Sequence, residues 1–134
     1  MHFMENKCDT LYTADYVVTQ NEGRDIIRGG AVAISGNSIL CVGHADMLEI
    51  LYPDARRVNM GASVIMPGLI NAHTHLATAA LRSYTDDLSS HEALEALLQK
   101  EAKMDSRGAK AAAKLAIAEC LRFGIPSVSD LYYY

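Results

Sequence analysis

The strongest constraint on the fold is an apolar segment, residues 64–75, which ends in Met-Pro-Gly-Leu-Ile-Asn-Ala-His-Thr-His. The apolar residues predict a strand, and His73 and His75 lie where that strand should end. Successive side chains of a strand point to opposite faces, so both imidazoles should project from the same face, about 7 Å apart along the chain. Two imidazoles on one face can share a cation such as zinc, whose bonds to nitrogen are about 2.0–2.1 Å long. The segment therefore predicts half of a metal site.

The residues around the histidine pair decide how much weight it carries. The chain has five histidines, so such a pair arises easily by chance, and two ordinary strand histidines are the alternative interpretation. Pro67-Gly68 separates the short apolar segments 64–66 and 69–70. A Pro-Gly pair interrupts the backbone between two extended segments. This context favours the metal site.

Length and composition narrow the class of protein. The chain has 134 residues, 50% of them hydrophobic, which is ample for the core of one ordinary domain. A net charge of −4 leaves no basic surface for nucleic acid. The sequence starts without the apolar stretch of a signal peptide, and it has no run of membrane-spanning length. Cys8, Cys41 and Cys120 are odd in number and widely spaced, as expected for buried thiols in the reducing cytoplasm.

Residues 10–66 predict a small β-sandwich that contains one helix. Short β-branched and aromatic or apolar runs predict strands at 11–13, 16–19, 31–34, 39–42, 57–60 and 63–66. Residues 35–38, Ser-Gly-Asn-Ser, predict a hairpin turn between two of these strands. Residues 45–52 have helical spacing, and Pro53 should stop that helix.

The pattern changes after the histidine pair. Ser89 and Glu92 predict a capping box at the start of a helix. A longer, alanine-rich helix should run from about residue 106 to 123, with Gly124 as its left-handed C-terminal cap. Residues 125–131 predict a second strand. Strand, helices and strand form a βαβ unit, whose two parallel strands need further neighbours. A (β/α)8 barrel usually needs about 250 residues, so we expect the chain to be the N-terminal part of a longer enzyme.

Three segments in the same order resemble the metal-dependent amidohydrolase superfamily. They are residues 66–75, residues 81–88 (Leu-Arg-Ser-Tyr-Thr-Asp-Asp-Leu), and residues 121–125 together with 129–133. The last two are similar to segments of methylthioadenosine/S-adenosylhomocysteine deaminases and related chlorohydrolases. The resemblance implies an α/β fold in which residues 65–134 are the first βαβ portion of a TIM barrel. Residues 1–64 would be the N-terminal part of a β-sandwich domain built from both chain ends.

The resemblance also implies one divalent metal ion, usually zinc and sometimes iron, held in part by His73 and His75. The remaining ligands in such enzymes are histidines on strands five and six and an aspartate on strand eight, and none of these strands is expected here. His2, His44 and His91 lie in a tail, after a predicted hairpin and at a helix start, so none should replace them. We therefore expect the 134-residue chain alone to be inactive.

The implied reaction is hydrolytic deamination of a small molecule, an aminated heterocycle derived from adenosine or a related purine or pyrimidine. Water activated by the metal would attack the ring carbon that bears the amine, and ammonia would leave after proton transfer. A cyclic-amide hydrolase of the same superfamily is one alternative, although dihydroorotases place an arginine where this chain has Ala77. A non-catalytic remnant is the other alternative. Whether the complete enzyme forms a homo-oligomer is left open by the sequence.

Three acidic residues are candidate substrate contacts. Asp87 follows the first barrel strand in a loop of the kind that builds barrel active sites. The alternative is that Asp86 and Asp87 only keep this loop solvated. Asp130 ends the second strand, where it would contact substrate or cap the next turn. Glu101 is a shifted match to the glutamate that holds the purine in adenosine-type deaminases. Arg82 would pair with the neighbouring aspartates or anchor the loop.

Overall fold

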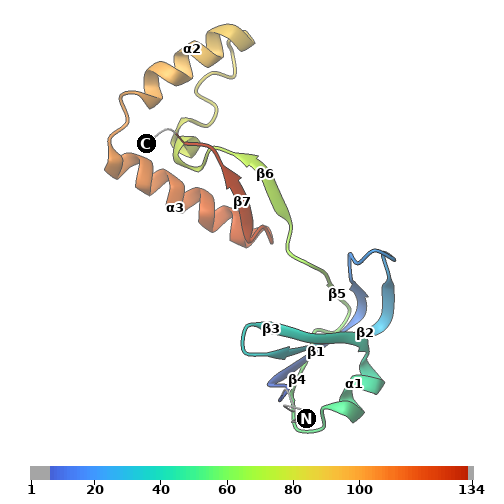
Figure 1. Ribbon diagram of the computed structural model, residues 1–134. Coiled ribbons are helices and arrows are strands. Elements are labelled where there is room, and N and C mark those ends of the chain that lie inside the picture. Colours follow the sequence, from blue (N-terminus) through green and yellow to red (C-terminus); the bar gives the residue numbers. More distant parts are fainter. Residues whose placement is uncertain (1–6, 133–134) are drawn as a thin grey trace. The chain divides into compact units, whose positions relative to one another are not determined.

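The computed structural model describes residues 7–132, so the expectation for His2 lies outside the described residues. The chain forms two compact units, Met1–Pro67 and Gly68–Tyr134 (Figure 1). The boundary between the units falls after Pro67, whereas the sequence placed the domain boundary after residue 64. Among the described helices, none combines the length and apolar character needed to cross a bilayer.

The first unit is a five-stranded sheet built around its first strand. In order along the chain, the elements are β1 (Thr10–Val18), β2 (Ile26–Ser35), β3 (Ser38–His44), α1 (Ala45–Leu51), β4 (Arg56–Asn59) and β5 (Val64–Ile65). The strand order is β3-β2-β1-β4, and β5 also pairs with β1. The pairs β1–β2 and β2–β3 are antiparallel, whereas β4 and β5 run parallel to β1. The predicted hairpin between β2 and β3 is confirmed.

The prediction of separate strands at 11–13 and 16–19 is wrong, because β1 runs without interruption through Ala14 and Asp15. Ala14 is buried and lies opposite Gly30 of β2. Alanine, aspartate and glycine are all depleted in strands, so pairing with β2 continues β1 where the local sequence does not favour a strand. The first half of β2 was missed because it contains Arg28, Gly29 and Gly30.

The core of the first unit lies between the sheet and α1. Leu48 of α1 packs with Leu11 of β1 and with Ala31 and Ala33 of β2, and all four side chains are buried. The small side chains of β2 allow the helix to approach the sheet closely, because no bulky group separates their backbones. Removal of this apolar area from water is what holds α1 in place.

The second unit is a βαβ arrangement with additional helices. Its elements are β6 (Ile70–Thr74), the 3₁₀ helix η1 (Leu76–Leu81), α2 (Ser90–Glu101), α3 (Ser106–Arg122) and β7 (Ser127–Asp130). The strands β6 and β7 are parallel, as predicted. Figure 1 shows α3 running alongside this strand pair.

Local sequence signals set the ends of the helices in the second unit. The predicted capping box is present at α2, where the Ser89 N–H and hydroxyl donate to the Glu92 carboxylate at 3.2 and 2.6 Å. These bonds lower the pKa of the Glu92 carboxyl. Asp105 caps α3 by accepting the Gly108 N–H at 2.6 Å. Gly124 follows α3 with φ +73°, the left-handed conformation that glycine adopts without strain.

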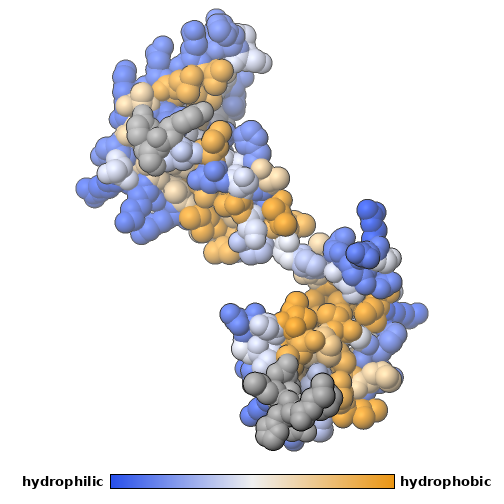
Figure 2. All heavy atoms as spheres, in the orientation of Figure 1, coloured by the Kyte–Doolittle hydropathy of each residue, from blue (hydrophilic) through white to orange (hydrophobic). Residues whose placement is uncertain are grey.

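Helix α3 buries a narrow stripe of alanines. Ala109, Ala112 and Ala116 are buried, whereas Leu115 and Leu121 are exposed. The first unit also exposes large apolar side chains. Figure 2 shows the hydrophobic residues of both units as orange regions.

Candidate metal centre

The two histidines of the predicted metal site lie together at the carboxyl end of β6. The structure places the Nε2 atoms of His73 and His75 3.2 Å apart, with ring centroids separated by 5.1 Å and ring planes at 69°. Both residues are exposed. The side chains project to the same side, as the alternation of a strand predicts.

The pairing of β6 with β7 is irregular between Asn71 and Thr74, the segment that contains His73. The paired positions advance by three residues along β6, from Asn71 to Thr74, and by two along β7, from Val128 to Asp130. One residue of β6 is therefore left without a partner, in the manner of a β-bulge, which locally redirects side chains. The sequence carries no clear signal for this irregularity.

The spacing of the two rings fits a shared metal ion. Two nitrogen ligands that lie about 2.0–2.1 Å from one ion at a tetrahedral angle are about 3.3–3.4 Å apart. The observed Nε2–Nε2 distance of 3.2 Å is close to this value. Within residues 7–132, no group of three or more His, Cys, Asp or Glu side chains is arranged to hold a metal. Because catalytic zinc sites generally use three protein ligands, the pair alone is an incomplete ligand set.

A backbone carbonyl selects the tautomer of His75. Its Nδ1 lies 2.9 Å from the carbonyl oxygen of Leu131. A carbonyl oxygen only accepts hydrogen bonds, so Nδ1 carries the proton and donates. In the neutral ring, Nε2 then has a free lone pair, and this lone pair faces His73. A second hydrogen bond of this kind is what orients most metal-binding histidines.

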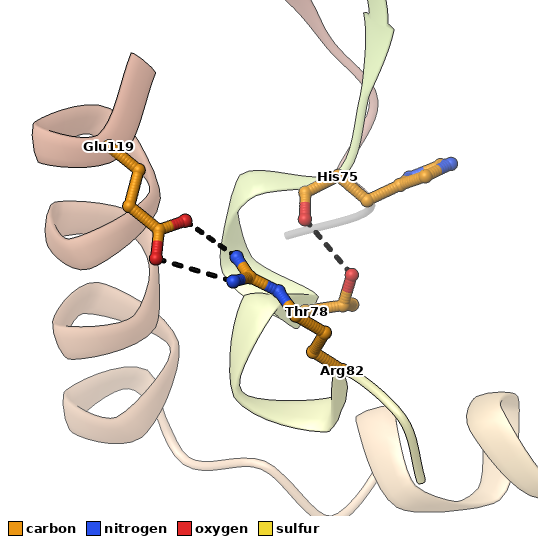
Figure 3. A network of polar contacts seen from close by, with 4 residues as sticks. All are labelled: His75, Thr78, Arg82 and Glu119. Atoms are coloured by element: carbon orange, nitrogen blue, oxygen red, sulfur yellow. Dashed lines mark hydrogen bonds and ion pairs between the residues drawn. The ribbon is translucent and has the colours of Figure 1, made fainter. Parts of the chain in front are cut away.

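The backbone around His75 is tied to the end of β7 and to η1. Leu131 N–H donates to the Thr74 carbonyl at 3.0 Å, and Leu76 N–H donates to Asp130 Oδ1 at 2.9 Å. The Thr78 hydroxyl donates to the His75 carbonyl at 3.0 Å, a contact drawn in Figure 3. The peptide groups on both sides of the His75 ring are therefore held by hydrogen bonds.

An ion pair joins η1 to α3. Arg82, just after η1, donates from both terminal nitrogens to the Glu119 carboxylate at 3.3 and 2.6 Å (Figure 3). These hydrogen bonds lower the pKa of the Glu119 carboxyl and raise that of the Arg82 guanidinium. Arg82 therefore anchors its segment through Glu119, and the alternative of pairing with Asp86 or Asp87 is not what the structure shows.

The three predicted substrate contacts lie in different places. Asp87 is exposed in the turns between η1 and α2, and Glu101 is the half-buried last residue of α2. Asp130 ends β7 and lines a cavity of about 520 Å³, together with Ala77, Lys110 and Tyr132. A second cavity, of about 430 Å³, is lined by residues that include His75, Thr78, Arg82 and Glu119. Of the three acidic residues, the structure brings only Asp130 next to the histidine segment.

Sequence reasoning missed three groups beside the histidine pair. The Leu131 carbonyl leaves no trace in the sequence, because every residue has one. Thr78 follows His75 by three residues, a spacing at which a hydroxyl often binds a preceding carbonyl. Glu119 and Arg82 are 37 positions apart, so only the fold pairs them.

Comparisons with known proteins show the family of the chain. Residues 64–134, slightly more than half of the chain, match the model of the amidohydrolase family. The chain is 39% identical over 126 residues to a 5-methylthioadenosine/S-adenosylhomocysteine deaminase of Nitratidesulfovibrio vulgaris, covering 93% of this chain and 28% of the relative.

Two solved structures show the same fold over this length. An adenosine deaminase from Xanthomonas campestris with bound zinc has a TM-score of 0.78 at 30% identity, covering 96% of this chain and 30% of that one. An atrazine chlorohydrolase from Arthrobacter aurescens complexed with zinc has a TM-score of 0.75 at 24% identity, covering 90% and 28%. The chain thus spans less than a third of the length of these proteins. The family match, which includes both histidines, establishes that the chain belongs to the amidohydrolase family.

Proposed function

We propose that the full-length protein is a metal-dependent deaminase that releases ammonia from an aminated heterocycle. The observation that carries this proposal is the pair of imidazoles at the carboxyl end of β6, 3.2 Å apart at Nε2 and with the His75 tautomer fixed by Leu131. The similarity to proteins named as adenosine-type deaminases supports the reaction type.

His73 and His75 would hold one divalent ion, with zinc as the first candidate and iron as the second. When bound, such an ion supplies Lewis-acid activation of water at neutral pH. The contribution of this chain is to place two imidazole nitrogens, Nε2 of His73 and Nε2 of His75, 3.2 Å apart. The Leu131 carbonyl keeps the His75 proton on Nδ1, so that Nε2 is available to the ion. The missing ligands would come from outside residues 7–132.

The proposed substrate is a purine or related ring bearing an exocyclic amine. The named relatives act on methylthioadenosine, S-adenosylhomocysteine and 5'-deoxyadenosine, which supports a nucleoside-like molecule. Asp87 and Glu101 remain candidate contacts to that molecule. Asp130 lies closer to the histidine pair, where its carboxylate accepts the Leu76 N–H at 2.9 Å.

We also infer the place of each unit in the complete fold. The parallel pair β6 and β7, with α3 between them in sequence, fits the first βαβ portion of a TIM barrel. The five-stranded sheet of the first unit would be one part of a β-sandwich domain. The amidohydrolase family match over residues 64–134 and the adenosine deaminase structure with bound zinc support the first of these inferences.

The test uses the purified full-length protein loaded with zinc. Ammonia release is measured on adenosine, methylthioadenosine and S-adenosylhomocysteine, and bound zinc is measured in parallel. His73→Ala and His75→Ala should each lower turnover by at least about 10³-fold, because each removes a metal ligand. His91→Ala is the control, since His91 is an exposed residue of α2 that pairs with Glu95.

Two results would contradict the proposal. Turnover and zinc content that stay at the wild-type level in both histidine variants would reject the ligand assignment. A full-length protein that binds zinc and releases no ammonia from any amine-bearing ring would favour a cyclic-amide hydrolase or a non-catalytic remnant.

A further inference from the structure

We propose that Asp130 is a positioning residue for His75, acting through the backbone, instead of a substrate contact. This inference rests on the proposed function, because it assumes that His75 is a metal ligand. It assigns a role to the acidic residue at the end of β7, for which the sequence left substrate binding and capping as open alternatives.

The Asp130 carboxylate binds the first peptide N–H after His75. Its Oδ1 accepts the N–H of Leu76 at 2.9 Å, across 54 positions of sequence. Leu76 is the first residue of η1 and its side chain is buried. The N–H groups in the first turn of a helix have no acceptor within the helix, so Asp130 supplies the acceptor that this group needs.

The residue after Asp130 binds the His75 ring itself. The Leu131 carbonyl accepts from Nδ1 at 2.9 Å, and the Leu131 N–H donates to the Thr74 carbonyl at 3.0 Å. Residues 74–76 are thus held by residues 130 and 131 through three hydrogen bonds. One holds the peptide before His75, one holds the ring, and the Asp130 bond holds the peptide after it. Without the Asp130 bond, the peptide between His75 and Leu76 keeps only the bonds that its carbonyl accepts from Thr78, so the backbone that carries the His75 ring is held less firmly against the Leu131 carbonyl.

A substrate contact would give a different result. Asp130 also lines the cavity of about 520 Å³ with Lys110 and Tyr132, so a ligand in that cavity could reach it. A carboxylate that binds substrate affects KM and leaves metal affinity unchanged. A carboxylate that positions His75 affects metal affinity and the ring tautomer in the absence of any substrate. The two roles are therefore separable by measurement.

The experiment compares Asp130→Ala, Asp130→Asn and Asp105→Ala in the full-length protein. Asparagine keeps an oxygen that can accept the Leu76 N–H, and Asn caps helices about as well as Asp. Asp105→Ala is a matched control, because Asp105 also accepts a backbone N–H at the start of a helix, 2.6 Å from Gly108 N, yet has no hydrogen bond to residues 73–76. Zinc affinity is measured by competition with a chromophoric chelator, and the His75 tautomer by ¹⁵N NMR of the metal-free protein.

We expect Asp130→Ala to weaken zinc binding by about 10–100-fold, the usual cost of losing an outer contact of a metal ligand. The same variant should lose the single Nδ1–H tautomer of His75. Asp130→Asn should retain both properties to within a few-fold, and Asp105→Ala should retain them fully. Zinc affinity in Asp130→Ala equal to that of Asp105→Ala would overturn the inference, as would a change confined to KM. If wild-type protein binds zinc no better than His75→Ala, the proposed function itself fails.

Discussion

At the scale of single residues, Gly68 sets how closely two segments of the second unit approach. A Cβ atom at this position would lie 2.6 Å from Cδ of Pro126 and closer still to Cγ. The Leu69 N–H next to it donates to the Gly124 carbonyl at 2.9 Å, so the backbone cannot move away without loss of this bond. We expect Gly68→Ala to lower the free energy of unfolding by about 1–3 kcal/mol, the usual cost of overpacking. Urea unfolding of the full-length protein measures this effect.

The matched control for Gly68 is Gly43→Ala in β3. A Cβ atom there would lie 3.7 Å from Leu48, an ordinary van der Waals distance. Gly43→Ala should therefore leave the urea midpoint close to that of the wild type. Equal midpoints for Gly68→Ala and wild type would show that Pro126 moves aside at no cost.

Residue types predicted the histidine pair but not what surrounds it. His73 and His75 are recognisable because alternation along a strand needs no knowledge of the rest of the fold. The Pro67-Gly68 pair predicted an interruption of the backbone, whereas the structure shows that Gly68 also makes room for Pro126. The carbonyl partner of His75 was not predictable, since it depends on where β7 ends relative to β6.

At the scale of elements, the attachment of η1 to α3 should depend on pH through the Arg82–Glu119 pair. The pKa of Glu119 is lowered in the folded state by hydrogen bonds from Arg82. A carboxyl whose folded pKa is lowered stabilises the fold above its unfolded pKa, and that contribution is lost as pH falls through the folded pKa. We therefore expect Glu119→Gln to have a lower Tm than wild type at pH 7, with a difference that shrinks as the pH falls below about 4, the range of ordinary carboxyl pKa values. Thermal melts across this pH range measure it.

Two further variants show whether this pH effect belongs to the ion pair. Arg82→Gln removes the other member of the ion pair, so the difference in Tm between this variant and wild type should show the same pH dependence. Glu22→Gln alters an exposed glutamate of the first unit and should give no such trend. The side chains of Arg82 and Glu119 are 61% and 38% exposed, and solvent weakens such a pair, so the effect at pH 7 should be small. A Tm difference for Glu119→Gln that is constant with pH would contradict the assignment.

Elements with local signals were predictable, and those set by neighbours were not. The capping box at Ser89 and the left-handed Gly124 lie within a few residues of the helices that they end, so the sequence alone located α2 and α3. The continuous β1 was not predicted because pairing of Ala14 with Gly30 of β2 overrides weak strand propensity. The 3₁₀ helix η1 was also missed. Two residues that hold it, Asp130 through Leu76 and Glu119 through Arg82, are distant from it in the sequence.

At the scale of the whole molecule, the 134-residue chain exposes many large apolar side chains in both of its units. In the second unit Ile70 is 75% exposed, Phe123 70% and Leu121 62%. In the first unit Ile50 of α1 is 80% exposed. Large exposed apolar patches in a water-soluble protein usually mark contact surfaces or sites of aggregation. The relatives are more than three times as long as this chain. In the full-length protein, the additional residues would pack against these apolar surfaces.

We therefore expect the 134-residue chain, produced by itself, to self-associate and to release no ammonia. Its apolar surface has no cover, and its two histidines form an incomplete ligand set within residues 7–132. Sedimentation velocity at several concentrations measures the association, and the full-length protein at equal molar concentration is the comparison. The full-length protein should form a single defined species and should carry the activity. A 134-residue chain that stays monomeric, melts cooperatively and deaminates adenosine would show that two histidines in this setting suffice, and it would overturn the assignment of the missing ligands to other parts of the protein.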